Sequence, residues 1–171
     1  MNLIDELVSS MEGNGRELDV NEFTARIERL KTRLYRVALL YVGSESVALD
    51  AVDETVYRGL KSLKKLRQPE YFDTWMTRIL INECKKELRH RKRELQLHAL
   101  PETAVEAFNA LPLKEAILRL PPELKEVIIL RYFSDFTLAE TAQSLEIPQG
   151  TAVTRQRRAL ALLRLELSEE G

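Results

Sequence analysis

The sequence has little of what a strand-rich or disulfide-bonded protein needs. Its 171 residues include one cysteine, six glycines and six prolines, and aromatic residues make up only 6%. The single cysteine, Cys84, excludes an internal disulfide, and its position on the apolar side of a helical stretch indicates a buried thiol. Long alternating runs of β-branched residues are also absent, so we expect a mostly helical protein.

Signals for membrane insertion, export and catalysis are missing as well. No apolar run approaches the length that crosses a bilayer, and the first residues, MNLIDELVSSMEGN, are acidic where a signal peptide would be basic. We therefore expect a soluble, cytoplasmic protein that does not insert into a membrane. His90 and His98 are not spaced with carboxylates or with Cys84 as a metal site or a nucleophile pair would be. We therefore expect a protein that is not an enzyme and that binds no metal or cofactor.

The charge of the chain is unevenly distributed. Lysine and arginine number 26 against 27 acidic residues, and a net charge of −1 is unusual for a protein that binds nucleic acid. Basic residues gather in two segments: residues 85–93, KKELRHRKR, hold six against one acid, and residues 155–164 hold four arginines and no acid. In residues 1–22 and 94–106, most of the charged residues are acidic. Charges of opposite sign in separate segments indicate different surfaces for different partners.

Residues 137–160, TLAETAQSLEIPQGTAVTRQRRAL, have the pattern of a helix-turn-helix. Thr137 and Glu140 have the spacing of a capping box, so a first helix should begin there, and Pro148 favours a turn followed by a second helix from about residue 149. A helix that carries several arginines fits the major groove and can bind phosphates and guanine edges. We expect DNA binding here; the alternative is a solvated basic helix face.

Three longer helices are expected upstream. Apolar residues at helical spacing predict helices over residues 22–42, ended by Gly43, over residues 44–66, and from about residue 73 into the basic segment. The second of these is expected to carry Val47, Val52, Val56, Leu60 and Leu63 on or near its inner face, and the third to turn Trp75, Ile79, Leu80, Cys84 and Leu88 inward.

The expected fold class is all-α, with two small helical domains joined by a tether, the second domain containing the helix-turn-helix. The expected boundaries are an N-terminal extension (1–20), a first domain (21–93), a linker (94–111) and a second domain (112–171).

In this order, the segments resemble the extracytoplasmic-function (ECF) sigma factors of bacterial RNA polymerase, which belong to the sigma-70 family. The stretch LYRVALLYVGSESVALDAVDETVYRGLKSL is similar to the opening pair of helices of that family, and YFDTWMTRILINECKKELRHRKR is similar to its promoter-reading helix. The stretch LPPELKEVIILRYFSDFTLAETAQSLEIPQGTAVTRQRRALALLR is similar to its carboxy-terminal domain. The resemblance implies a region-2-like first domain, a region-4-like second domain and promoter-specific transcription initiation with promoter melting.

The resemblance also implies a site for core polymerase. In this family the second helix carries an acidic motif that docks on a basic coiled coil of the β′ clamp, and Asp50, Asp53 and Glu54 stand at the matching positions. Their spacing puts them on one helix face. Asp53 departs from the glutamine usual in the family, which keeps the face acidic. A solvated acidic face with no partner is the alternative.

By the same resemblance, the loop at residues 67–72 and the following helix melt the −10 region and hold an extruded base. A flipped base needs stacking and hydrogen bonds that offset its lost stacking in the duplex. The expected −10 contacts are Arg67, Gln68, Tyr71, Phe72, Arg78 and Asn82, with Lys85, Lys86 and Arg89 holding duplex phosphates just upstream. Trp75 also matches the family, but its spacing places it in the core.

For the −35 element, the resemblance implies readout by the second helix of the helix-turn-helix. The matching positions are Thr151, Thr154, Arg155, Arg157 and Arg158. Val153 replaces a usual lysine or arginine, and Gln156 replaces a usual apolar inward residue. Gln156 would reach an adenine only if the helix were rotated from the family orientation.

The implied partners are core RNA polymerase, through its β′ clamp and β flap, promoter DNA, and an anti-sigma factor of the kind that is often membrane-anchored. Two other functions fit parts of the sequence. A stand-alone helix-turn-helix regulator would use residues 1–92 for dimerisation, and a helical adaptor would bind protein without promoter DNA.

Overall fold

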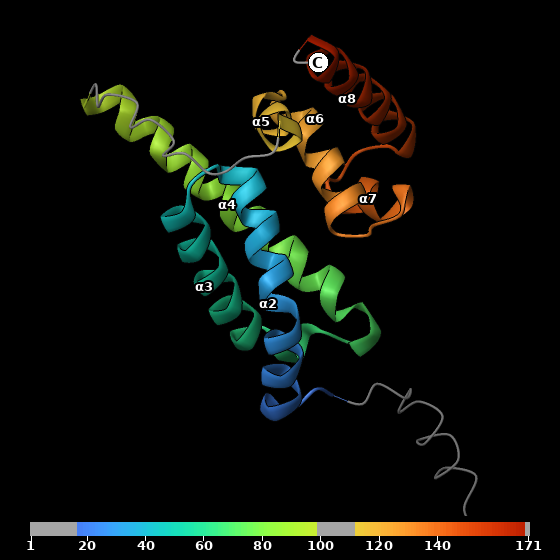
Figure 1. Ribbon diagram of the computed structural model, residues 1–171. Coiled ribbons are helices and arrows are strands. Elements are labelled where there is room, and N and C mark those ends of the chain that lie inside the picture. Colours follow the sequence, from blue (N-terminus) through green and yellow to red (C-terminus); the bar gives the residue numbers. More distant parts are fainter. Residues whose placement is uncertain (1–16, 99–111, 170–171) are drawn as a thin grey trace, which may run out of the picture.

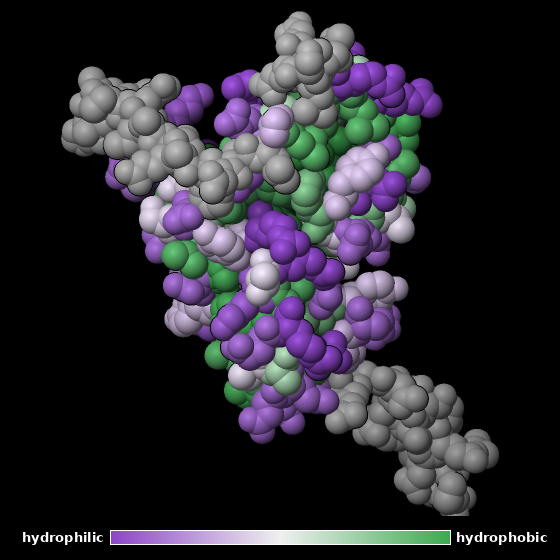
Figure 2. Space-filling view, in the orientation of Figure 1, coloured by the Kyte–Doolittle hydropathy of each residue, from purple (hydrophilic) through white to green (hydrophobic). Residues whose placement is uncertain are grey.

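The computed structural model describes residues 17–98 and 112–169, and within them every regular element is helical (Figure 1). The elements are α2 (Val20–Val42), α3 (Glu45–Lys61), α4 (Phe72–His98), α5 (Pro112–Arg119), α6 (Pro122–Ile128), a π-helical segment (Ile129–Phe133), α7 (Leu138–Ser144) and α8 (Gln149–Glu169), with 3₁₀ turns at Leu63–Lys65 and Pro69–Tyr71. Helices α2, α3 and α4 pack together as a first domain, and α5, α6 and α7 pack on α8 as a second. The all-α, two-domain fold expected from the sequence is confirmed. Hydrophilic residues cover α2 on the face seen in Figure 2, and hydrophobic residues show between them.

Helix α2 has well-defined ends. Its first helical residue is Val20, two residues before the predicted start, because the Asp19 carboxylate accepts a hydrogen bond from the Glu22 N–H at 2.8 Å and the Glu22 carboxylate accepts one from the Asp19 N–H. At the other end, Gly43 adopts a φ of 71° and donates its N–H to the Leu39 carbonyl. The predicted left-handed end at Gly43 is confirmed.

Helix α3 packs closely on α4 because its inner face carries small residues. A Cβ atom at Gly59 would lie 2.6 Å from the Met76 Sδ, so the Met76 side chain occupies the space beside this glycine and would have to shift to admit a larger residue. The buried residues of α3 are Ala48, Ala51, Val52, Thr55 and Gly59. The predicted inward position of Leu60 is wrong: its side chain is 42% exposed, because the face that enters the core is centred on Gly59 and its small neighbours. The helix also ends at Lys61 rather than near residue 66.

Helix α4 begins at Phe72, directly after a 3₁₀ turn, and its first half forms the centre of the first domain. The side chains of Phe72, Met76 and Leu80 are at most 1% exposed. Trp75 is half-buried and packs against this core, as predicted. The helix continues to His98, so residues 94–98 of the predicted linker are helical; no glycine or proline interrupts the charged sequence there. Residues 99–111 of the predicted linker, and most of the predicted N-terminal extension, lie outside the described residues.

The helix-turn-helix of the second domain forms as predicted. The Thr137 hydroxyl accepts a hydrogen bond from the Glu140 N–H at 3.1 Å, and the Glu140 carboxylate accepts one from the Thr137 N–H at 2.7 Å. Helix α7 ends at Ser144, and Glu146 adopts a left-handed φ of 55° in the turn. Helix α8 then begins at Gln149.

The two domains meet at the carboxyl end of α2. The Tyr41 hydroxyl donates a hydrogen bond to the Glu126 carboxylate, and the same carboxylate lies 3.1 Å from the Lys85 Nζ. The Lys125 Nζ donates to the Tyr41 carbonyl at 3.2 Å. Burial first, and Glu126 second, raise the pKa of Tyr41 far above its ordinary value, so its hydroxyl remains a donor. Burial lowers the pKa of Lys125, and Glu126 opposes that shift.

Candidate functional site

The outer face of α3 combines acidic and apolar side chains. Asp50 and Asp53 are exposed and lie one turn apart on the same side of the helix. Leu49, Tyr57 and Leu60 share that side and are 53%, 56% and 42% exposed. The sequence pattern identified the two aspartates, but it overlooked Leu49 and Tyr57 and assigned Leu60 to the core. Exposed apolar groups beside acids suit a partner helix that carries both apolar and basic residues.

Glu54, the third predicted acid, has a different environment. It is half-buried, and its Oε1 accepts a hydrogen bond from the Arg58 Nε at 2.8 Å. The same Arg58 nitrogen lies 2.7 Å from the Oε1 of Glu83 on α4, whose side chain is only 7% exposed. The positive charge of Arg58 therefore compensates the negative charge of the nearly buried Glu83 carboxylate. Glu54 helps to hold α3 against α4 and contributes less free charge to the outer face than the two aspartates do.

The side chains predicted to meet the −10 element lie in the loop before α4 and along one side of that helix. Arg67, Gln68 and Tyr71 are exposed in the loop, Tyr71 by 51%. On α4, the residues at helical spacing on one outward side are Arg78, Asn82, Lys85, Lys86 and Arg89, and all except the half-buried Lys85 are exposed. The structure thus places the predicted α4 residues on one polar side of the first domain.

The prediction that Phe72 contacts a base is wrong. Its side chain is 1% exposed and packs edge-on against Phe23, with ring centroids 5.7 Å apart and 82° between the ring planes. The Arg26 Cζ lies 5.6 Å from the centroid of the same ring. As the first residue of α4, Phe72 turns into the core. The preceding residue, Tyr71, is the exposed aromatic residue of the loop.

Lys85 has a partner in the second domain. Its Nζ lies 3.1 Å from the Glu126 carboxylate, which is buried and also accepts the Tyr41 hydroxyl. The spacing of Lys85 among the basic residues of α4 gives no sign of this pair, because the acid is distant in sequence. A phosphate at Lys85 would share the three N–H donors of its ammonium group with the Glu126 carboxylate.

Helix α8 separates an apolar inner side from a polar outer side. Ala152 and Ala159 are fully buried and Leu163 is 7% exposed. On the opposite side, the exposed predicted residues are Thr154, Arg157 and Arg158, and the half-buried Thr151 and Arg155 lie on the flank. The basic face expected from the sequence is therefore present and faces away from the second domain's core.

Gln156 is turned inward rather than toward the outer side of α8. It is half-buried, and its Oε1 accepts a hydrogen bond from the Arg131 Nε at 3.2 Å. Arg131 also donates to the Phe136 carbonyl at 2.5 Å. This arginine ties the π-helical segment to the start of the helix-turn-helix and to α8. An adenine contact by Gln156 does not fit this orientation, because its carboxamide oxygen is already engaged.

The side chains capable of metal or nucleophilic chemistry are dispersed. Cys84 is fully buried, and burial, with the nearby Glu83 and Glu87, raises its pKa to about 12, so the thiol stays protonated. His90 is exposed and lies 3.6 Å from Glu94, one turn away on α4. Within the described residues, no group of three or more His, Cys, Asp or Glu side chains is placed to hold a metal ion. In the same part of the chain, each helix falls short of the length or apolarity that a bilayer requires.

Comparison with known proteins identifies both domains. Residues 26–94 match the family model of sigma-70 region 2, and residues 116–165 match that of sigma-70 region 4. The chain therefore belongs to the sigma-70 family, and within it to the ECF sigma factors. It is an alternative sigma factor, which directs promoter-specific transcription. The two matches in this order favour this function over the stand-alone regulator and the adaptor.

Individual relatives cover most of the chain. The RNA polymerase sigma factor SigV of Bacillus subtilis is 33% identical over 82% of this chain and 87% of its own length. The ECF sigma factor SigW of the same organism is 26% identical over 88% of this chain and 91% of its own length.

Solved structures share the fold at lower identity. The sigma factor RpoE of Bartonella quintana, in complex with the anti-sigma factor NepR, has a TM-score of 0.76 at 22% identity and covers 87% of this chain and 98% of its own. CnrH, in complex with the cytosolic domain of CnrY, has a TM-score of 0.70 at 21% identity and covers 98% of this chain and 99% of its own.

Proposed function

We propose that three surfaces divide the work of this sigma factor. The outer face of α3 binds core RNA polymerase, the loop at residues 67–72 with the outward side of α4 binds the −10 element, and the outward side of α8 binds the −35 element. The observation that carries the assignment is the separation of charge: the acidic and apolar face lies on α3, and the cationic faces lie on α4 and α8. Each surface thus has the charge that its partner requires.

On α3, Asp50 and Asp53 supply the charge and the exposed apolar residues supply contact area. A basic coiled coil of the β′ clamp would cover both, so the interface gains specificity from the aspartates and affinity from burial of Leu49, Tyr57 and Leu60. Glu54 acts mainly through Arg58, by holding α3 in place.

At the −10 element, Tyr71 is the side chain best placed to stack on an extruded base, since it is aromatic and half-exposed. Arg67 and Gln68 supply hydrogen-bond donors beside it. Along α4, the exposed cations Lys86 and Arg89 hold phosphates, and position the strand without reading its sequence.

At the −35 element, the exposed Arg157 and Arg158 and the exposed Thr154 face the major groove. An arginine fork suits a guanine edge or a phosphate. Thr151 and Arg155, on the flank of α8, are placed for backbone contacts. The inward Gln156 sets the rotation of α8 through Arg131 and does not read a base.

The partners of the free protein follow from this assignment. The second domain meets the polymerase β flap. An anti-sigma factor, of the kind seen with the structural neighbours, covers the polymerase-binding face, and such a partner is in some cases membrane-anchored. The sigma factor works in the cytoplasm and has no catalytic activity of its own, because the polymerase supplies the chemistry.

Run-off transcription from genomic fragments tests the proposal. Purified bacterial core polymerase is assayed with and without this protein, and binding to core polymerase is measured in parallel. Discrete transcripts that depend on the protein are expected, and their start sites define the promoters. Core binding without such transcripts would contradict the proposed DNA-binding faces, and loss of both would contradict the proposed polymerase face.

The α3 assignment has its own test. Replacing both Asp50 and Asp53 with lysine should abolish binding to core polymerase and leave the helix content unchanged, because both side chains are exposed. Glu54 is left intact, since its hydrogen bond to Arg58 is structural. A matched control changes Glu17 and Glu28 to lysine, which alters the net charge equally at exposed positions outside α3. Equal core binding by the two variants would refute the assignment.

A further inference from the structure

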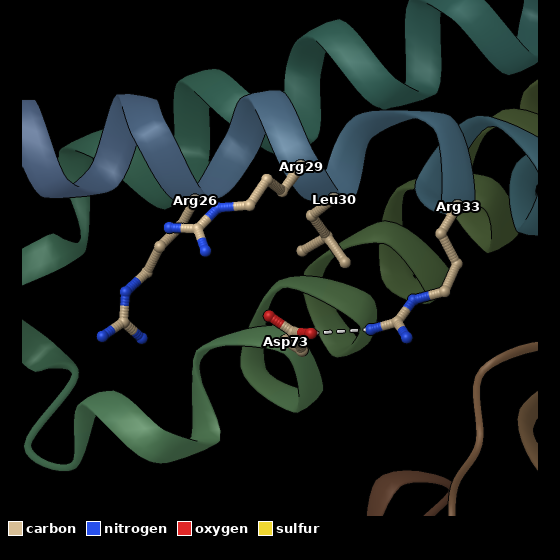
Figure 3. Close-up of a pocket in the computed structure, with 5 residues that line it drawn as sticks. All are labelled: Arg26, Arg29, Leu30, Arg33 and Asp73. Carbon is tan, nitrogen blue, oxygen red and sulfur yellow. Dashed lines mark hydrogen bonds and ion pairs between the residues drawn. The ribbon is translucent and has the colours of Figure 1, made fainter.

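A cavity of about 390 Å³ lies between α2 and the start of α4. It is lined by Arg26, Arg29, Leu30, Arg33 and Asp73. Figure 3 shows the three arginines extending from α2, with Asp73 facing them from α4. The spacing of three and four residues brings the three guanidinium groups to one side of α2, and they outnumber the single carboxylate. The cavity therefore has a net positive charge, and no sequence motif of the promoter-binding segments includes these arginines.

Two of the three guanidinium groups are held in place. The Arg26 NH1 donates to the Pro69 carbonyl at 2.5 Å, and the Arg33 NH2 lies 2.7 Å from the Asp73 Oδ2. Arg29 is exposed, and among the described residues its guanidinium group makes one long hydrogen bond, 3.5 Å from Nε to the Ala25 carbonyl of its own helix. Its terminal nitrogens thus have their donors available. Two guanidinium groups held in fixed positions, and a third that can reorient, form an arrangement suited to a phosphate.

The position of the cavity favours one source of that phosphate. Arg26 is bonded to Pro69, which lies inside the loop at residues 67–72 proposed to hold the extruded −10 base. A single strand that leaves this loop along the first domain would pass directly over the cavity. We propose that the cavity binds a backbone phosphate of the promoter's non-template strand next to the extruded base. This inference rests on the proposed function and adds a strand-holding site on α2 to it.

An acid of the second domain competes for the same cavity. The Asp135 Oδ2 lies 3.7 Å from the Arg33 NH1, so part of this guanidinium faces the second domain rather than a ligand. Asp135 adopts a φ of 57° in the left-handed region, which asparagine tolerates as well as aspartate does. Asp135→Asn therefore removes the competing charge and preserves the backbone.

The experiment uses holoenzyme, assembled from core polymerase and the full chain, on a promoter found by run-off transcription. Arg29→Ala should weaken the open complex about tenfold, as expected for loss of one charge-assisted hydrogen bond, and lower the salt dependence of binding by about one phosphate contact. Lys31→Ala is the matched control, because it removes one positive charge from an exposed position on another side of the same helix. Asp135→Asn should strengthen binding by up to about fivefold, the scale of a surface ion pair.

Uncharged methylphosphonate linkages, placed one at a time in the non-template strand, identify the phosphate. At the contacted position, the neutral linkage should weaken the wild-type complex more than the Arg29→Ala complex, because one of the three guanidinium partners is already gone in the variant. The inference is overturned if every linkage weakens both complexes equally, or if Arg29→Ala behaves as Lys31→Ala does. It is also overturned if millimolar inorganic phosphate competes in the wild type while no linkage has an effect, which assigns the cavity to a free anion.

The two possible failures are distinguishable. If wild-type holoenzyme forms no promoter-dependent transcripts, the proposed function fails. Suppose instead that the wild-type holoenzyme initiates normally and that the wild-type and Arg29→Ala chains bind core polymerase equally well. If Arg29→Ala then leaves the open complex unchanged, only the cavity assignment fails.

Discussion

Replacing Tyr41 with phenylalanine should loosen the junction between the two domains. The substitution deletes one hydroxyl from a side chain that is 2% exposed, so it removes the hydrogen bond to the Glu126 carboxylate and leaves the ring in place. A hydrogen bond to a charged group contributes about 1.5–3 kcal/mol. Because Glu126 keeps Lys85 at 3.1 Å as a second partner, we expect the free energy of unfolding to fall by an amount near the lower end of this range, about 1.5–2 kcal/mol.

Urea unfolding with two probes measures this loss. The only tryptophan of the chain, Trp75, reports on the first domain, and far-UV circular dichroism reports on the helices of both. Since buried contacts join the two domains, the transitions of the wild type should coincide. In Tyr41→Phe the midpoint should fall by about 1 M urea, for an m-value of about 2 kcal/mol/M, and the two probes should begin to separate.

The controls isolate the shared hydrogen bond. Tyr57→Phe makes the same chemical change at a side chain that is 56% exposed, and should stay within about 0.5 kcal/mol of the wild type. Glu126→Gln and the double variant complete a thermodynamic cycle with Tyr41→Phe, and the two effects should be non-additive because both change the same hydrogen bond, the first by making its acceptor neutral. Additive effects, or a Tyr41→Phe loss no larger than that of Tyr57→Phe, would refute the reasoning.

Three further outcomes are expected. Arg158→Ala should weaken promoter selection by about 1–3 kcal/mol if the arginine reads a base, measured by binding to −35 variants; an equal loss on every variant would make it a phosphate contact. Gly59→Ala should lower the free energy of unfolding by about 1 kcal/mol, because overpacking against the fully buried Met76 exceeds the gain in helix propensity; when Met76→Ala is the reference protein, adding Gly59→Ala should cost much less, because the clashing side chain is gone. The Cys84 thiol should react with maleimide at pH 8 only after unfolding. Since its folded pKa is about 12, stability should fall as the pH rises from about 9, where the unfolded thiol ionises, and Cys84→Ala should lack this part of the slope.

The helix ends were predictable where a local rule sets them. The box of Thr137 and Glu140 and the glycine at position 43 each act within a few residues, so the sequence contains all the information that those ends require. The box of Asp19 and Glu22 is equally local; it was missed because the predicted start followed the hydrophobic period instead. Local capping is thus the more reliable guide to these helix ends.

The faces of the helices were less predictable than their extents. Leu60 was expected inside because it is apolar, but the fit of Gly59 against Met76 determines which side of α3 enters the core. Phe72 was expected at a base because it lies in the −10 loop of the family pattern, yet it is the first residue of α4 and packs on Phe23. Both errors arise because packing between helices decides these positions, and the hydrophobic periodicity of a single helix carries no information about that packing.

The contacts between the domains lie beyond any sequence pattern, and they bear on the promoter-binding residues. Lys85 is paired with Glu126, and Arg33 faces Asp135, so two cations of the first domain are held by acids of the second. The first pair is the stronger constraint, because Glu126 is buried and an unpaired buried carboxylate is costly, whereas the Asp135 side chain is 85% exposed. In the proposed promoter complex, a phosphate that displaced Lys85 from Glu126 would favour separation of the domains, which returns Glu126 to water. In the proposed promoter complex, packing of the second domain and binding of DNA by the first would thus involve the same positively charged side chains.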